Sequence, residues 1–412
     1  MNNQNKVRSS HNMDDLKYRT HCRYFNEYHL KPKNVSIFMF KKLFNKIFKK
    51  SKKNTANLYY FENSKKTTNA QQETEHKQTD IEYSVKNTVS IAPIIRSFDE
   101  QYQQDFYDYL LGSSPSVSSS YNDELSKLIS EKIENLLKSP KLILDSLPTL
   151  PLSLTKIMAQ LNNDDFDANE LIKLIQQEPA IAAKVIELAN SSYYNRQSKE
   201  INDLKSAFMV LGVNGLSEGV INGFVSRLVP HPSIYFRQYG QKIWQHSLST
   251  GITAKALVAK SPLKAHAAQA YFIGLICNLG DLIIYQLLID AFAVVPPDCQ
   301  PNSVLFKNMM AKNSKRLTYF IAKYWNFPNS ILEVLALQAQ VKKSALLPAL
   351  HKKMPIACFI YEAKVISELQ MRLTQQTIDN DYIKEVSTSL LFTEQATVQL
   401  NLILANNQLE SA

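Results

Sequence analysis

From residue 122 to the C-terminus, hydrophobic side chains recur every three or four residues, the spacing of one face of an α-helix. The stretch NDELSKLISEKIENLLK shows this best, and Asn122 suits the N-cap position before it. No run alternates between apolar and polar positions as a half-buried strand does. The pattern therefore predicts an all-α protein, with later helices at about 235–260, 264–289, 303–325, 328–341, 354–372 and 379–405.

Caps and breaks divide this helical region into two parts. Asp167 suits the N-cap of the helix in DANELIKLIQQ, and Pro179 follows the end of that helix. The segment INDLKSAFMVLGVNGLSEGVINGFVSRLV predicts two helices that part near Gly212. The prolines of VPHPS then separate an N-terminal helical subdomain, residues 122–232, from a second helical subdomain, residues 233–412.

The first 121 residues are mostly polar, and we expect them to be largely disordered. One exception is FDEQYQQDFYDYLLG, in which Phe98, Tyr102, Phe106 and Leu110 recur every four residues. This spacing predicts a short helix over residues 98–111 that ends at Gly112.

The second exception is a basic amphipathic helix, predicted over about residues 37–50. Its apolar face holds Phe40, Leu43, Phe44, Ile47 and Phe48, and its basic face holds Lys42, Lys46 and Lys49. Such a helix suits an anionic membrane surface or a partner protein. A helix docked on the folded domain, or a solvated tail, are alternatives. Met39 is a second candidate start codon, and the sequence does not decide between it and Met1.

The net charge of +10 belongs to the N-terminal region. Residues 1–66 carry 16 Lys and Arg against 4 Asp and Glu, which is +12 and leaves −2 for the rest of the chain. The folded part is therefore not expected to bind nucleic acid. Four scattered cysteines without a CxxC pair, no secretory signal pattern and no long apolar run predict a cytoplasmic protein. The candidate for a peripheral contact with the inner membrane is the helix at residues 37–50.

Several segments then occur in a specific order: LPTLPLSLTKIMAQL, EPAIAAKVIELANSSYYN, INDLKSAFMVLGVNGL, IWQHSLSTGITAKAL, AYFIGLICNLGDLIIY and YWNFP. Together they resemble the HDOD domain, an HD-related output domain of bacterial signalling proteins. The resemblance spans about residues 147–345 and includes Asn190, Ser191, Gly212 and Gly280. It implies a helical subdomain packed on a degenerate HD-like bundle, and a regulator or scaffold that binds other signalling proteins.

Two polar residues, Asn190 and Ser191, end the most distinctive of these segments. Their side chains can bond the free backbone groups at a helix end, so we expect a buried cap. Contact with a ligand is the alternative.

The resemblance also locates a metal site that has lost its ligands. A working HD site holds a metal ion with a His, an adjacent His-Asp pair and a distant Asp. Here His246 matches the first His, Cys277 and Asn278 take the place of the pair, and Lys364 falls near the last Asp. Gln338 stands where many relatives carry a His pair. We therefore expect no bound metal, no cofactor and no catalytic residue.

The same residues have ordinary structural interpretations. Cys277 is expected to be a small buried hydrophobic residue, and His246 a hydrogen-bonded histidine of the core or cleft. Asp281 is expected to cap the helix that follows it, and Lys364 to point to solvent.

Two other functions stay open. One is a metal-dependent phosphohydrolase with substituted ligands. The other is a metal-free module that binds a phosphate or nucleotide through His246, Asn278, Gln338 and Lys364. The sequence does not identify the partner, the input signal or the oligomeric state.

Overall fold

The structure is a computed structural model that describes residues 97–112, 124–160, 167–191, 194–195, 200–230, 239–292 and 303–411. Within these ranges the regular elements are all helices, so the predicted all-α fold is confirmed. Residues 37–50 lie outside the described residues. In chain order the helices are α4 (Phe98–Leu111), α5 (Glu124–Lys138), α6 (Lys141–Leu144), α7 (Leu152–Gln160), α8 (Ala168–Gln176), α9 (Pro179–Ala189), α10 (Leu204–Ser226), α11 (Tyr239–Ala259), η1 (Lys264–His266), α12 (Ala267–Ile276), α13 (Leu279–Phe292), α14 (Ser303–Tyr324), α15 (Asn329–Gln340), η2 (Ser344–Leu346), α16 (Leu347–His351), α17 (Pro355–Thr374), α18 (Asn380–Leu390) and α19 (Glu394–Ser411).

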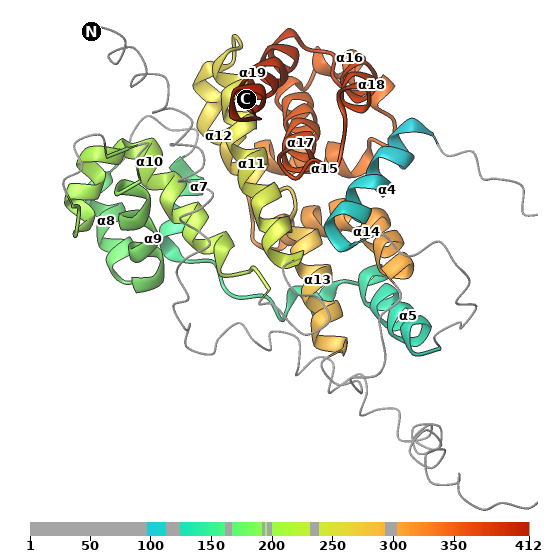
Figure 1. Cartoon of the computed structure of the whole chain (residues 1–412). Coiled ribbons are helices and arrows are strands. Elements are labelled where there is room, and N and C mark those ends of the chain that lie inside the picture. Colours follow the sequence, from blue (N-terminus) through green and yellow to red (C-terminus); the bar gives the residue numbers. More distant parts are fainter. Residues whose placement is uncertain are drawn as a thin grey trace, which may run out of the picture.

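The helices form two groups (Figure 1). Helices α7 to α10 make a small bundle, and α11 to α19 make a larger body. In the small bundle, α8 begins as predicted because the Asp167 side chain accepts hydrogen bonds from the backbone amides of Asn169 and Glu170. Helix α9 begins with Pro179. Proline suits the first helical position because the backbone N–H that it lacks would have no partner within the helix there. Its buried stripe of Ile181, Val185 and Ala189 packs against α10.

The predicted break near Gly212 is confirmed as a kink within α10. Gly212 has φ 64° and ψ −172°, a conformation that residues with a Cβ atom rarely adopt. The segment after the kink is buried along most of its length. Before the kink, by contrast, Met209 is 78% exposed.

In the larger body, α12 and α13 form the centre of the core. Two stretches of the described chain, Leu204–Ser226 and Lys264–Ala291, are long and apolar enough to cross a membrane. In their most apolar windows, however, 67% and 94% of the residues are buried against the rest of the protein. Burial of this kind is typical of core helices in a folded domain.

Two predicted helices are each divided in the structure, which corrects the sequence analysis. The helix expected at about 264–289 is broken between α12 and α13, at Cys277 and Asn278. The helix expected at about 379–405 is broken between α18 and α19. At this second break the buried carboxylate of Glu362 accepts hydrogen bonds from the backbone amides of Phe392 and Thr393, each at 2.8 Å, and these bonds take the place of helical ones.

Helices α4 and α5 pack against the larger body (Figure 1). The helix predicted at 98–111 is confirmed, with a capping box between Ser97 and Glu100 and with Gly112 at its C-terminal end. The sequence analysis grouped residues 122–138 with the N-terminal subdomain, but α5 contacts α14 of the larger body.

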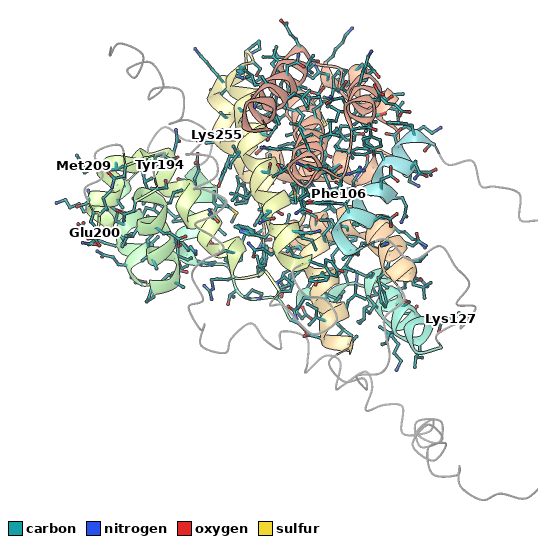
Figure 2. The ribbon with its side chains drawn as sticks, in the orientation of Figure 1. Phe106, Lys127, Tyr194, Glu200, Met209 and Lys255 are labelled. Atoms are coloured by element: carbon teal, nitrogen blue, oxygen red, sulfur yellow. The ribbon has the colours of Figure 1, made fainter. Side chains whose placement is uncertain are left out.

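One polar cluster joins the small bundle to the larger body. The Glu218 carboxylate of α10 accepts hydrogen bonds from the Tyr194 hydroxyl, at 3.0 Å, and from the Lys255 ammonium group of α11. Figure 2 shows Lys255 between the two groups of helices. Glu218 is buried, so this cluster fixes how α10 lies against α11.

Candidate functional site

Some of the residues predicted from the HD resemblance lie close together in the larger body. Cys277, Gln338 and Lys364 line one small pocket, and the His246–Asn278 pair lies next to it; we call this region the cleft. The predicted residues of the cleft are thus His246, Cys277, Asn278, Gln338 and Lys364.

His246 and Asn278 form a buried pair. The Asn278 amide nitrogen lies 3.2 Å from His246 Nδ1, and the two side chains are 0% and 2% exposed respectively. This contact occupies Nδ1 of the imidazole ring. Burial, together with the charge of Lys364, lowers the pKa of His246 well below its usual value. The prediction of a hydrogen-bonded histidine is confirmed, and the ring is neutral.

Two atoms of this pair have no hydrogen-bond partner among the described residues. They are His246 Nε2 and Asn278 Oδ1. Nε2 lies 3.5 Å from Glu368 Oε1 but lacks the geometry of a hydrogen bond. Buried polar atoms are usually satisfied, so Asn278 Oδ1 keeps unused hydrogen-bonding capacity.

Cys277 behaves as the sequence predicted. Its side chain is buried, and Sγ donates to the backbone oxygen of Gly274 at 3.1 Å. Burial raises the pKa of the thiol to about 11. At neutral pH the group is therefore an uncharged thiol, which is neither a good nucleophile nor a good metal ligand.

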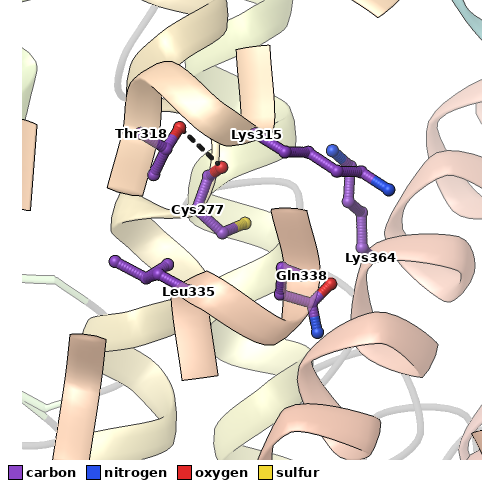
Figure 3. Close-up of a pocket in the computed structure, with 6 residues that line it drawn as sticks. All are labelled: Cys277, Lys315, Thr318, Leu335, Gln338 and Lys364. Carbon is purple, nitrogen blue, oxygen red and sulfur yellow. Dashed lines mark hydrogen bonds between the residues drawn. The ribbon is translucent and has the colours of Figure 1, made fainter. Parts of the chain in front are cut away.

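A small pocket opens beside Cys277 (Figure 3). Its volume of about 10 Å³ is the room of roughly one water molecule. The lining residues come from the α12–α13 turn and from α14, α15 and α17: Cys277, Lys315, Thr318, Leu335, Gln338 and Lys364. Lys364 is partly buried and faces this pocket, so the expectation that it points to solvent was wrong. The nearby carboxylates of Asp281 and Glu368 make this position favourable for a cation.

The two lysines respond differently to the pocket. Burial works to lower the pKa of Lys364, but Asp281 and Glu368 outweigh it, and the pKa is raised. Burial, and next the charge of Lys364, lower the pKa of Lys315 to about 8. Both groups are therefore mainly ammonium ions at neutral pH, and they repel each other.

Asp281 and Glu368 supply the negative charge of the cleft. Asp281 lies in the first turn of α13, where it accepts a 2.8 Å hydrogen bond from the Tyr107 hydroxyl of α4. The sequence analysis expected it to cap α13; instead, the buried side chain is bonded to α4. Burial raises the pKa of Glu368 to about 7, although Lys364 acts against this rise.

Gly280 and Thr318 fix the crossing of α13 over α14. The Gly280 amide donates to Thr318 Oγ1 at 2.9 Å. A Cβ atom at Gly280 would lie 2.0 Å from the backbone oxygen of Ser314, so only glycine fits there. This glycine of the sequence motif thus sets the distance between the α12–α13 turn and Lys315.

Helix α4 packs over His246. The Phe106 ring packs edge-on against the His246 ring, with centroids 4.7 Å apart. The Tyr102 hydroxyl donates to the backbone oxygen of Val365 at 3.2 Å. Together with the bond from Tyr107 to Asp281, these contacts close this side of the cleft.

Asn190 and Ser191 lie in the small bundle and do not line the pocket. The Asn190 amide donates to the backbone oxygens of Ile186 and Ile201 and accepts from the Ile201 amide at 2.9 Å. Ser191 Oγ donates to the backbone oxygen of Leu188. The prediction that they form a cap is confirmed.

The residues of the cleft do not fit a divalent cation. Among the described residues, no three His, Cys, Asp or Glu side chains are close enough to share a metal ion. His246 Nδ1 is occupied by Asn278, and Gln338 donates to the backbone oxygen of Ala357. Two ammonium groups also face the place that a metal would need.

A scan against protein-family models matches the HDOD domain at residues 147–341. These are the residues of the small bundle together with the larger body through α15. The chain contains an HDOD domain. The resemblance read from the sequence motifs is thus confirmed, and α4, α5 and the helices from η2 to α19 lie outside the matched segment.

One relative of this chain matches about the same length of sequence as the domain model. An uncharacterized protein of Treponema pallidum (strain Nichols) is 24% identical over 196 residues, which are 47% of this chain. The matched part is only 37% of that relative's own length.

Two solved structures are also similar to the chain. An HDOD domain protein of unknown function from Geobacter sulfurreducens has a TM-score of 0.48 at 18% identity, covering 70% of this chain and 95% of its own. A Shewanella amazonensis protein whose name proposes a metal-dependent phosphohydrolase has a TM-score of 0.46 at 18% identity, covering 69% and 99%. Likenesses at this level carry no argument about function.

Sequence reasoning missed two charged residues of the cleft and the helix that covers it. Lys315 and Glu368 belong to no motif, and only the packing of α14 and α17 brings them to the pocket. One local signal was present for Glu368, which lies four residues after Lys364 and therefore on the same face of a helix. No signal in the sequence pairs Phe106 with His246.

Proposed function

We propose that this protein is a non-catalytic HDOD scaffold or regulator in bacterial signal transduction, which acts by binding other signalling proteins. The pair Lys315 and Lys364 carries the proposal, since it stands beside Asn278 where an HD hydrolase would hold its metal ion. Two ammonium groups repel a divalent cation, and a neutral amide replaces a carboxylate ligand.

A group of exposed apolar side chains on the small bundle supports partner binding. Around the kink of α10, Met209, Val210 and Val213 are 78%, 40% and 37% exposed. Met209 lies on the side of the small bundle that faces away from the larger body (Figure 2). Exposed apolar side chains grouped in this way are typical of protein-binding sites.

The experiment is a partner capture with three versions of the full chain as bait. These are the wild type, Met209→Asp, and Leu402→Asp as a control at another exposed apolar position, 49% exposed on α19. A partner that binds the wild type and Leu402→Asp but not Met209→Asp supports the proposal. If Met209→Asp captures the same proteins as the wild type, the partner does not bind at the exposed side chains around Met209. If none of the three baits captures a protein, the scaffold role is contradicted.

A metal-dependent phosphohydrolase with substituted ligands is the competing function. It requires His246 and Cys277 to recruit further ligands, which the described cleft does not offer. Turnover of a phosphodiester substrate by the wild type, lost in His246→Ala, would favour this enzyme.

The proposed location is the cytoplasm, with peripheral contact to the inner membrane through residues 37–50. On an anionic membrane surface, each of the three lysines Lys42, Lys46 and Lys49 would contribute about 1 kcal/mol to the free energy of binding. Changing all three to Gln should therefore weaken binding to phosphatidylserine-containing vesicles by about a hundredfold in a sedimentation assay. Equal binding of the two proteins would assign the segment to another role.

A further inference from the structure

The pocket beside Cys277 places two cations together and gives neither of them a close partner. Lys315 and Lys364 both line it (Figure 3). Among the described residues, neither ammonium group forms a hydrogen bond or a close ion pair, and their charges oppose each other. Asp281 and Glu368 lie close enough to offset part of this repulsion, but no acceptor lies within hydrogen-bonding distance of either ammonium group among the described residues.

The carboxylates of the cleft do not fill this role. Asp281 accepts its hydrogen bond from Tyr107, and Glu368 lies 3.5 Å from His246 Nε2. They lie close enough to stabilise the charge of Lys364 but not to form an ion pair with it. Each lysine therefore keeps its three N–H donors for another acceptor.

The rest of the pocket wall does not repel an anion. Leu335 is apolar and Cys277 is an uncharged thiol. Gln338 and Thr318 are neutral, and their donors are bonded to backbone oxygens. The room of about one water molecule accommodates one oxygen of an oxyanion, while the remainder of the ligand would lie at the mouth.

We propose that Lys315 and Lys364 bind a phosphoryl group, either as inorganic phosphate or as the end of a small phosphate monoester. Its oxygens accept charge-assisted hydrogen bonds from the two ammonium groups, which have no other acceptor among the described residues. Helix α4 covers His246, so the ligand enters from the side of α14, α15 and α17. This site goes beyond partner binding and does not depend on it.

The test is isothermal titration calorimetry on the full chain with phosphate, methyl phosphate, sulfate and acetate. We expect phosphate or methyl phosphate to bind more tightly than acetate, with sulfate between them because it is a dianion that accepts hydrogen bonds less strongly. If phosphate alone binds, the ligand is the free ion; if methyl phosphate binds as well, it is a monoester. No heat with either phosphate, or equal affinity for acetate, would overturn the proposal.

Variants assign the binding to the two lysines. Lys315→Met and Lys364→Met should each weaken phosphate binding by about tenfold to a hundredfold, because each removes charge-assisted hydrogen bonds. Lys312→Met is the matched control, since Lys312 is an exposed lysine on the same helix α14. Unchanged affinity in both pocket variants, or an equal loss in the control, would place the anion elsewhere.

A further variant covers the case in which a lysine variant fails to fold. Glu368→Gln removes negative charge near the pocket while both lysines stay in place. It should tighten phosphate binding by several-fold above pH 7, where the wild-type carboxyl is ionised. Weaker binding in Glu368→Gln would contradict an anion site built on these lysines.

Discussion

Two asparagines show how differently the small bundle and the larger body use polar side chains. Asn190, at the end of α9, makes three hydrogen bonds to backbone atoms of Ile186 and Ile201. The Asn278 side chain, between α12 and α13, makes one hydrogen bond, to His246, and its Oδ1 has no partner among the described residues.

The contrast extends to the neighbours of each asparagine. Around Asn190 the partners are backbone atoms, so the side chain serves to close the helix end. Around Asn278 they are ionisable groups, which burial and mutual charge shift in their pKa values: His246, Lys315, Lys364 and Glu368. Buried ionisable groups with shifted pKa values lower the stability of a fold and are concentrated at functional sites. We therefore expect a ligand to bind in the larger body rather than in the small bundle.

The largest expected effect is on the stability of the small bundle. Asn190→Ala removes three hydrogen bonds, two of them to backbone groups of Ile201, and should lower the free energy of unfolding by about 3 kcal/mol. Asn278→Ala removes one hydrogen bond and should cost about 1 kcal/mol. Urea unfolding followed by circular dichroism measures both.

Ser191→Ala is the control for this pair, since it removes a single bond to the Leu188 oxygen at the same helix end. It should cost less than Asn190→Ala. A larger loss in Asn278→Ala than in Asn190→Ala would reverse the comparison between the two halves.

A second prediction concerns pH and the larger body. The pKa of Glu368 is about 7 in the folded protein, against an ordinary value of 4.5. The folded state thus holds the proton more tightly, and this group makes the wild type lose stability as pH rises from 4.5 to 7. Glu368→Gln has no carboxyl group at this position and does not lose stability in this way. Its free energy of unfolding should therefore rise relative to that of the wild type by at most about 3 kcal/mol between pH 4.5 and pH 7.

The matched control is Glu385→Gln, because Glu385 is exposed on α18. The stability of this control is measured over the same pH range. If the stability difference between Glu368→Gln and the wild type does not grow with pH, the burial of Glu368 does not disfavour its ionised form and the account of the cleft is wrong.

The smallest effect is expected where α4 meets the cleft. Tyr107→Phe removes the 2.8 Å hydrogen bond to Asp281 and should cost about 1.5 kcal/mol, because the acceptor is a buried carboxylate. Tyr109→Phe removes a partly buried 3.3 Å bond to the Met371 oxygen and should cost less. Thermal unfolding measures the stability of both variants. An equal loss of stability in the two would show that the hydrogen bond from Tyr107 to Asp281 adds no more stability than an ordinary, partly exposed one.

The fold followed from the sequence wherever the signal was local. The four-residue recurrence of Phe98, Tyr102, Phe106 and Leu110 placed α4, and Gly212 marked the kink of α10. The break after α18 was missed because its cause, Glu362, lies about thirty residues earlier in the chain. A carboxylate that accepts from a distant backbone leaves no periodic trace.

The site was predictable in part for the same reason. Motif order placed His246, Cys277, Asn278, Gln338 and Lys364 in one cleft, and the structure brings them together. The direction of Lys364 was not predictable, since it depends on Asp281, Glu368 and Lys315, which arrive from other helices. The spacing of residues along the sequence does not reveal charges that interact only through tertiary packing.

The central claim is that lysines and a neutral amide stand where an HD enzyme would hold its metal. Metal content by mass spectrometry, on the full chain purified without chelator, tests it most directly. We predict far less than one equivalent of any transition metal or magnesium in a stable, folded protein. A near-stoichiometric metal that is lost in His246→Ala would contradict the account, since the cleft would then have ligands that the arrangement of Asn278, Lys315 and Lys364 excludes.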